Sequence, residues 1–266
     1  MTRLAWLPLL VACGPKTVPA LPYSFAAYGD CRHYHKVHAN LCDAMVRSGA
    51  KFVLVSGDLV DHGDREDQWV RFREITKDLR ARAEYLPAMG DHDGKLFPKE
   101  FGLEKLYYDR VIGDVHVFVL DSTKRFGDAE QLAWLEDRAA ASKSLHRMAV
   151  FHHPPFTIDP DRQPGAEEIR GRIHWVLVKH RFCAAWTGHD HGFYTTARDG
   201  VRYVVTAGGG ASLFEPDPSK GRPGDLWKSF YHFVGCRIEG RRIAAQVIDE
   251  DGDEVPALAF TVCDHP

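Results

Sequence analysis

A short apolar segment that ends in a glycine and two carboxylates places the strongest constraint on how this chain can fold. Residues 52–61 read FVLVSGDLVD. A run of large apolar residues rich in β-branched side chains is typical of a strand buried on both faces, as in the sheets of α/β proteins. The run stops at Gly57, and Asp58 and Asp61 follow in the loop. Since α/β proteins place their chemistry in loops at the carboxyl ends of strands, the segment predicts an α/β fold with a functional site there.

Four other segments repeat this pattern of a predicted strand that breaks into Asp or His. They are YGD at residues 28–30, MGDHD at residues 89–93, FHHP at residues 151–154 and TGHDH at residues 187–191. Carboxylate oxygens and imidazole nitrogens are common ligands of metal ions. Five such loops predict one polynuclear metal site gathered from the whole chain.

The order of the predicted elements indicates the architecture. Before residue 187, predicted strands alternate with helices at residues 35–46, 67–83, 128–141 and 169–178, and residues 95–108 are irregular. After residue 187 only strands are predicted, at residues 193–196, 202–206, 231–238 and 242–248. This change within one domain predicts a second sheet packed on the first, in a four-layer α/β/β/α sandwich of two mixed sheets with the metal site at strand ends.

Length and charge limit the number of domains and the class of partner. The 266 residues, 44% of them hydrophobic, can bury an adequate core, and no Ser- or Gly-rich linker divides them. We therefore expect one domain. The formal net charge of -3 is not that of a basic surface, which argues against nucleic acid as a partner.

The first residues predict export. Arg3 precedes a short apolar segment, and residues 10–13, LVAC, resemble the cleavage box of bacterial lipoproteins. The resemblance implies a signal peptide over residues 1–12, an acylated Cys13 that begins a tether over residues 13–22, and a domain over residues 23–266. We therefore expect a lipid-anchored protein of the bacterial cell envelope, on the periplasmic face or the cell surface. The alternative is an apolar N-terminus that contains a cysteine by chance.

The five cysteines after Cys13 are an odd number, so an exported protein would keep at least one of them unpaired or pair it with another chain. Cys236 and Cys263 lie on predicted strands and could pair with each other. Cys31 and Cys183 are interpreted as small buried packing groups. No C-x-x-C spacing indicates a thiolate metal site.

Taken together and in order, the five loops resemble the five sequence blocks of the calcineurin-like metallophosphoesterases, which include the purple acid phosphatases. The resemblance extends over roughly residues 23–249. It implies two divalent or trivalent metal ions, Fe, Mn or Zn, and assigns a ligand to each block. The first ion would be held by Asp30 and His191, the second by Asp91, His152 and His189, and Asp58 would bridge the two.

The same resemblance implies hydrolysis of a small-molecule phosphate monoester or diester by attack of a metal-bound hydroxide. His92 would protonate the leaving oxygen, and Asp93 could orient the His92 ring. Asp61 is expected to hydrogen-bond a metal ligand, and His153 to be a bystander of His152. The remaining histidines considered are interpreted as structural or surface residues: His33, His35, His38, His62 and His116.

Two residues depart from the family pattern. Arg32 stands where the first block usually has a histidine, and Asp91 stands where the third block usually has an asparagine. A guanidinium stays protonated and cannot bind a cation. Two alternatives remain open. Either both metals bind and Arg32 points at substrate phosphate, which we favour because Asp30, Asp58 and His191 are retained, or only the second metal binds and Arg32 replaces the charge of the first.

A first block of the form G-D-x-R also resembles a bacterial branch of this superfamily, so Arg32 need not mark lost activity. The competing function is a non-catalytic metal- or phosphate-binding envelope lipoprotein that keeps the fold. Retention of His92 argues against it. The glycine run at residues 208–210 is expected to approach the metal loops closely, and Trp227, Tyr231 and His232 could line a substrate groove.

Overall fold

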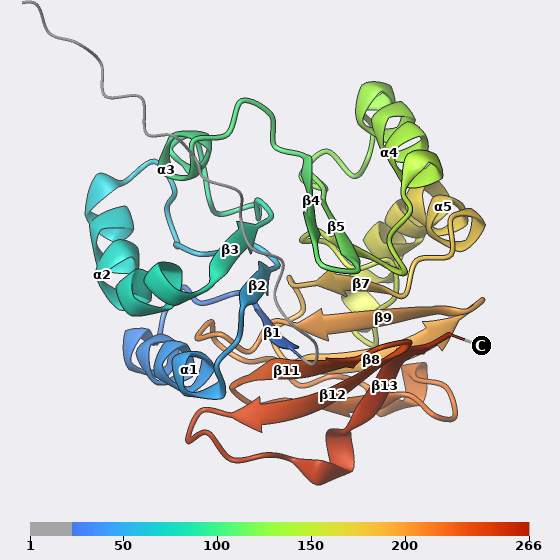
Figure 1. The fold of residues 1–266 in the computed structure, drawn as a ribbon. Helices are drawn as coiled ribbons and strands as arrows, with labels where there is room; N and C mark the ends of the chain where they lie inside the picture. Colours follow the sequence, from blue (N-terminus) through green and yellow to red (C-terminus); the bar gives the residue numbers. More distant parts are fainter. Residues whose placement is uncertain (1–22, 266) are drawn as a thin grey trace, which may run out of the picture.

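The computed structural model describes residues 23–265, which form two packed sheets flanked by helices (Figure 1). The predicted signal peptide, the tether and Cys13 lie outside the described residues. Within residues 23–265, no helix is both long and apolar enough to cross a membrane.

The first sheet has six strands in the order β13-β12-β11-β1-β2-β3. Their bounds are β1 Tyr23–Tyr28, β2 Phe52–Val55, β3 Glu84–Pro87, β11 His232–Glu239, β12 Arg242–Asp249 and β13 Phe260–Asp264. Strands β1, β2 and β3 are parallel, whereas β11, β12 and β13 pair antiparallel. All four residues of β2 are buried, as expected from its unbroken apolar sequence.

The second sheet has seven strands in the order β10-β8-β9-β7-β6-β5-β4. Their bounds are β4 Tyr108–Ile112, β5 Val115–Val119, β6 His146–Val150, β7 Ala184–Thr187, β8 Phe193–Arg198, β9 Val201–Thr206 and β10 Leu226–Lys228. Strands β5, β6, β7 and β9 are parallel, and β4, β8 and β10 pair antiparallel to their neighbours. Both sheets are therefore mixed, as predicted.

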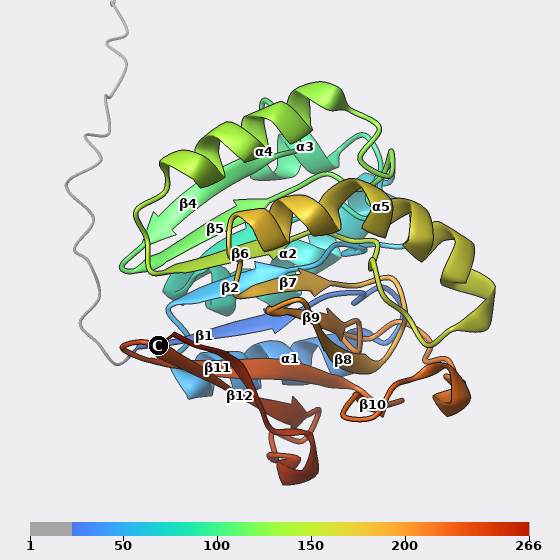
Figure 2. The same ribbon diagram turned by 90° about the vertical axis from the view of Figure 1, so that its right-hand side faces the viewer.

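Helices cover the outer face of each sheet, which confirms the predicted layers (Figure 2). On the first sheet lie α1 His35–Ser48, α2 Glu66–Arg82 and the short α3 Phe97–Phe101, and on the second lie α4 Ala129–Ala141 and α5 Gln163–Lys179. The largest apolar cluster fills the space between the sheets. There the rings of Phe25 and Phe52 stack with centroids 4.8 Å apart, and Trp186 of the other sheet meets Phe25 edge-on at 5.9 Å.

Several boundaries and elements differ from the prediction. Helix α5 begins at Gln163 rather than at residue 169, because Pro164 occupies the first turn, where a missing N–H costs nothing. The segment predicted to be irregular contains α3, and it is followed by the edge strand β4. Asp128 caps α4, since its carboxylate accepts a hydrogen bond from the Glu130 N–H at 2.9 Å.

Candidate metal centre

Each predicted metal ligand follows the carboxyl end of a parallel strand, and these ends meet at one edge of the two sheets. Asp30, Asp58 and Asp91 follow β1, β2 and β3 of the first sheet, whereas His152 and His189 follow β6 and β7 of the second. Backbone bonds tie the loops together, with the Asp30 N–H donating to the Gly57 carbonyl at 2.9 Å. The carboxyl ends of these strands therefore bring the five sequence blocks together in one site.

Three of these ligands have strained backbone. Asp30, Asp58 and His189 have φ values of 56°, 55° and 70°, in the left-handed region that residues with a Cβ rarely adopt. Such conformations persist only where the surrounding structure imposes them, and they are concentrated at functional sites.

Two glycines allow these loops to approach one another. A Cβ on Gly90 would overlap the backbone nitrogen and carboxylate of Asp58, and a Cβ on Gly188 would overlap the carboxylate of Asp30. Any other residue at either position would push a predicted ligand out of place. Gly90 and Gly188 thus each make room for the carboxylate of a different sequence block.

Asp93 holds the loop that carries Asp58. Its buried carboxylate accepts hydrogen bonds from the backbone N–H groups of Asp58, Leu59, Val60 and Gly90, at 2.7 to 3.3 Å. The prediction that Asp93 orients the His92 ring is therefore wrong. The backbone carbonyl of Asp61 does so, accepting from His92 Nδ1 at 2.9 Å.

One group of donor atoms gathers around Asp91. Single ligand atoms of Asp91, His152, His153 and His189 all lie within 4.8 Å of one another. Asp91 Oδ1 is 2.8 Å from His152 Nε2 and 3.3 Å from His189 Nδ1. His153, predicted to be a bystander, belongs to this group, with its Nε2 3.8 Å from Asp91 Oδ1. The only sequence feature that pointed to it was the doubled histidine before Pro154.

A second group contains Asp30, Asp58 and His191, again with ligand atoms within 4.8 Å of one another. His191 Nε2 is 3.6 Å from Asp30 Oδ1. Asp58 lies between the two groups, because its Oδ1 is 3.5 Å from His152 Nε2 while its Oδ2 faces Arg32. The structure thus brings all six predicted ligands together, with Asp58 in the position of a shared carboxylate.

The histidine rings are oriented as metal ligands require. His152 Nδ1 donates to the Ser56 carbonyl at 2.8 Å, and His191 Nδ1 donates to the Ser212 carbonyl at 2.7 Å. Each bond fixes the ring and turns Nε2 towards the carboxylates. A backbone carbonyl on the far nitrogen is the usual support of a metal-binding histidine, so these residues fit a bound cation.

The electrostatics of the site favour a cation. Burial raises the pKa of Asp30 well above its usual range, with Asp58 adding to the effect. Burial alone would lower the pKa of His152, but the charges of Asp58 and Asp30 and the bond to Asp91 raise it to about 10. The buried carboxylates thus favour positive charge beside them. A metal ion held by these residues would supply that charge, and its binding would displace a proton from His152.

Arg32 lies against the donors of the second group. Its Nη2 donates to His191 Nε2 at 3.0 Å, its Nη1 donates to His92 Nε2 at 2.7 Å, and its Nε is 3.4 Å from Asp58 Oδ2. Nη1 also donates to Asp61 Oδ1 at 3.2 Å. The guanidinium therefore uses the nitrogen of His191 that a first metal ion would need.

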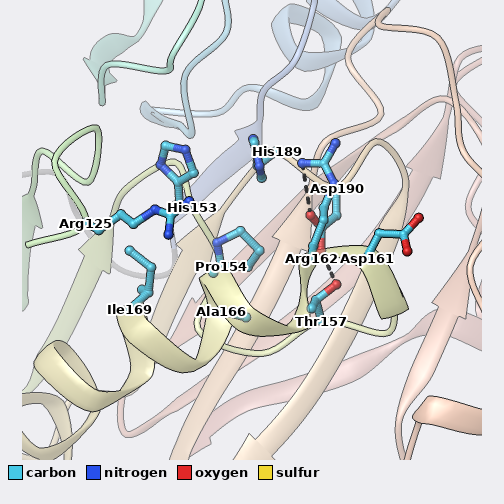
Figure 3. Close-up of a pocket in the computed structure, with 11 residues that line it drawn as sticks. Arg125, His153, Pro154, Thr157, Asp161, Arg162, Ala166, Ile169, His189 and Asp190 are labelled. Carbon is cyan, nitrogen blue, oxygen red and sulfur yellow. Dashed lines mark hydrogen bonds and ion pairs between the residues drawn. The ribbon is translucent and has the colours of Figure 1, made fainter.

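A pocket opens beside the group around Asp91 (Figure 3). Its volume is about 160 Å³. His153 and His189 form the wall nearest the candidate metal position, Pro154 and Ile169 form an apolar part, and Arg162 adds a cation. Asp190 lies beneath Arg162 and accepts a hydrogen bond from the Thr157 hydroxyl. The sequence had not singled out Arg162 or Asp190, and the pocket requires the turn before α5, which was not predicted.

The other residues considered from the sequence take different positions. His232 is buried and lies 3.3 Å from the Thr206 hydroxyl, so it cannot line a groove. His38 is also buried, contrary to the prediction of a surface or loop residue, and its Nε2 is 3.1 Å from the Tyr28 hydroxyl. His33 lies at the rim of the site, 3.2 Å from Asp61. The close approach predicted for the glycine run is confirmed, since Gly209 donates its N–H to the Gly29 carbonyl at 2.9 Å.

Comparisons with known proteins point to one family. The family model described as Calcineurin-like phosphoesterase matches residues 23–193, more than half of the chain. Purple acid phosphatase 5 of Arabidopsis thaliana is 22% identical over 202 residues, which are 73% of this chain and 50% of that protein. The chain thus spans about half the length of the curated relative that it matches.

Two solved structures are similar in fold. A purple acid phosphatase from yellow lupin (Lupinus luteus) seeds gives a TM-score of 0.81 at 17% identity, over 93% of this chain and 55% of that chain. A Plasmodium protein described as the anchor in the inner membrane complex gives a TM-score of 0.75 at 11% identity, over 92% of this chain and 90% of that chain. Both place the two mixed sheets with flanking helices in the same fold.

Proposed function

The chain belongs to the calcineurin-like phosphoesterase family, and on that premise we propose that it is a metal-dependent hydrolase of phosphate monoesters or diesters. The observation that carries the proposal is the convergence of Asp91, His152 and His189 with Asp58. These residues lie beside a pocket that is lined by the guanidinium of an arginine. Chemistry of this kind needs positive charge at the phosphoryl group and space for the rest of the ester.

The residues that we propose as metal ligands are Asp91, His152, His189 and Asp58. A divalent cation bound there would supply an activated water as nucleophile and neutralise charge on the phosphoryl oxygens. Mixed carboxylate and imidazole donors suit Fe, Mn or Zn. His153 completes the group on the side of the pocket, where its Nδ1 is 3.0 Å from the Ser122 hydroxyl.

Arg32 supports the second of the two alternatives that the sequence left open. Because its guanidinium contacts His191, His92 and Asp58 together, we propose that it replaces the charge of the first metal ion. A guanidinium presents several N–H donors in one plane, which matches the oxygens of a phosphoryl group. Arg32 would thus supply N–H donors to a phosphoryl group, next to the proposed metal ligand Asp58.

His92 is the proposed proton donor to the leaving oxygen. Its Nδ1 is held by the Asp61 carbonyl, so that Nε2 is the nitrogen directed into the site. Arg32 Nη1 donates to Nε2 at 2.7 Å. When a phosphoryl group takes over this bond of Arg32, Nε2 becomes free to carry and deliver a proton.

The pocket between His153 and α5 would receive the leaving group. Its apolar part, formed by Pro154 and Ile169, fits an aromatic or aliphatic alcohol. Arg162, whose Nη1 lies 3.5 Å from Asp190 Oδ1, gives the pocket a polar end. We therefore propose a small-molecule ester whose alcohol part is partly apolar.

Hydrolysis of p-nitrophenyl phosphate and of its bis ester, measured with Mn²⁺, Zn²⁺ or Fe ions, tests this function. We expect turnover with at least one metal and a loss of more than about 100-fold in Asp58→Asn, since metal-ion catalysis supplies several kcal/mol. Asp137→Asn, on the exposed face of α4, should keep full activity. Absence of turnover with every metal and both esters would favour the non-catalytic binding protein instead.

We also propose that the protein is exported and anchored through an acylated Cys13, on the basis of the sequence alone. Growth of the producing bacterium with radiolabelled palmitate should label the wild type but not Cys13→Ala. An unlabelled wild type that retains Met1 would contradict the anchor without affecting the proposed activity.

A further inference from the structure

A second cluster of metal-binding side chains lies far from the site described above. It contains His146, Cys183, Cys263 and His265. His146 is the first residue of β6 and Cys183 immediately precedes β7, whereas Cys263 lies in β13 of the other sheet and His265 just follows it. The cluster is thus at the amino-terminal ends of β6 and β7, the left-hand ends in Figure 2. His146 precedes His152 by six residues of extended chain, which span about 20 Å.

Four distances between the donor atoms of the cluster are close to those of a tetrahedral zinc site, and all four atoms lie within 4.8 Å of one another. Zinc bonds of about 2.3 Å to sulfur and about 2.05 Å to nitrogen give tetrahedral edges of roughly 3.6 Å between S and N and roughly 3.3 Å between two N atoms. Cys183 Sγ is 3.7 Å from His146 Nδ1 and 3.4 Å from His265 Nε2. Cys263 Sγ is 3.4 Å from His146 Nδ1, and the two imidazole nitrogens are 3.1 Å apart.

The backbone holds these side chains in place independently of any ion. His146 Nε2 donates to the Gly240 carbonyl at 2.8 Å, which directs the lone pair of Nδ1 into the cluster. The His265 N–H donates to the Arg241 carbonyl at 3.0 Å. The Cys183 N–H donates to the carbonyl of Arg147 at 2.7 Å. The donor atoms are therefore preorganised around a common centre.

Charge and donor type select the ion. Two thiolates and two neutral imidazoles offset the charge of a divalent cation, and a neutral unit can be buried where His146 and Cys183 lie. Sulfur and imidazole donors favour zinc over magnesium or calcium, which prefer oxygen. With four protein ligands the coordination is complete, which is the pattern of structural rather than catalytic zinc.

We propose that His146, Cys183, Cys263 and His265 bind one Zn²⁺ ion that fastens β13 of the first sheet to β6 and β7 of the second. The interpretation of Cys183 as a mere packing group is then incomplete. The sequence could not reveal the site, because its ligands come from three separate strands and include no C-x-x-C pair. The inference does not depend on the proposed hydrolase activity.

Metal analysis of the purified full chain tests the proposal. We expect Cys183→Ser and Cys263→Ser each to contain one zinc equivalent fewer than the wild type. Cys236→Ala should retain the zinc, because Cys236 is a buried cysteine of the same core that lies outside the cluster. Equal zinc content in the wild type and both serine variants would overturn the proposal.

A spectroscopic measurement on the wild type covers the case in which the serine variants do not fold. Replacement of zinc by Co²⁺ should give a thiolate-to-cobalt charge-transfer band, which oxygen and nitrogen ligands alone cannot produce. The same band should appear in Cys236→Ala. A disulfide between Cys183 and Cys263 in the purified protein, found by peptide mapping without reductant, or the absence of the band from the cobalt-loaded wild type, would overturn the site.

Discussion

Arg32 Nη2 lies 3.0 Å from His191 Nε2, on the nitrogen that the family pattern assigns to a metal ion. The ring cannot turn to offer its other nitrogen, because Nδ1 is already bonded to the Ser212 carbonyl at 2.7 Å. Arg32 and a first metal ion therefore compete for one donor, and the guanidinium has the advantage of three further contacts, with His92, Asp58 and Asp61.

This competition predicts that Arg32→His gains a metal ion. The substitution removes the guanidinium and supplies the imidazole that the family pattern has at this position, beside Asp30, Asp58 and His191. We expect the variant to bind one equivalent more than the wild type in metal titrations. Because the variant is compared with the wild type, zinc bound at another site contributes equally to both stoichiometries and does not affect the difference. Arg71→His, on the exposed face of α2, should bind the same number as the wild type. Equal stoichiometry in Arg32→His and wild type would show that Arg32 does not displace a metal.

The proposed role of His92 predicts an effect that depends on the leaving group. Loss of a general acid costs about 10²–10⁴-fold, and the cost falls on alcohols that leave poorly without a proton. His92→Ala should therefore reduce kcat for an alkyl phosphate far more than for p-nitrophenyl phosphate. His62→Ala, at a neighbouring exposed position, should change neither rate. Equal losses on both substrates would assign His92 to binding or metal positioning instead.

The sequence predicted those parts of the fold in which apolar residues form a continuous run or a regular helical stripe. The four residues of β2 are all buried, and the helical stripe of α1 buries Leu41 and Met45 against the same sheet. The edge strand β4 was missed, because its pattern of half-buried and exposed residues shows neither clear alternation nor a continuous apolar run. An edge strand has one unpaired side and needs less apolar sequence.

The candidate site was predictable where a ligand directly follows a strand end within a motif. Six residues meet that condition: Asp30, Asp58, Asp91, His152, His189 and His191. The contact partners of these residues were not predictable, because they depend on how two sheets pack. Asp93 binds the neighbouring loop rather than the His92 ring, and Cys183 meets Cys263 across the two sheets. Neither contact follows from a fixed spacing in the sequence, so a sequence pattern cannot predict it.

The burial of His38 predicts that the free energy of unfolding decreases in acid. Burial lowers the pKa of His38 to about 3, whereas a histidine in the unfolded chain titrates near 6.5. Between these two values the unfolded state binds a proton that the folded state does not, so the contribution is complete above pH 6.5 and is lost as the pH falls. We expect the wild type to lose about 1 kcal/mol more of its free energy of unfolding between pH 7.5 and pH 5.5 than His38→Gln does.

Urea denaturation at the two pH values measures this difference, because titration elsewhere in the chain affects both proteins alike. His62→Gln provides the control, since the His62 side chain is 63% exposed. Its free energy of unfolding should follow that of the wild type. Parallel losses in wild type and His38→Gln would mean that His38 is not the group that titrates.

The hydrogen bonds of Asp93 predict that its substitution lowers the affinity of the site for a metal ion, although Asp93 is not one of the proposed metal ligands. Its carboxylate accepts four backbone N–H groups, three of them from the loop that carries Asp58. In Asp93→Asn the amide nitrogen would face donors instead of accepting from them, and the turn that presents Asp58 would loosen. We expect metal affinity to fall by about 10–100-fold, as for other residues that support metal ligands. Asp64→Asn, whose carboxylate accepts from the Lys95 N–H on the protein surface, should leave the affinity unchanged. Isothermal titration with Mn²⁺ separates the two variants, and an unaltered dissociation constant in Asp93→Asn would show that the Asp58 turn is held by the surrounding backbone alone.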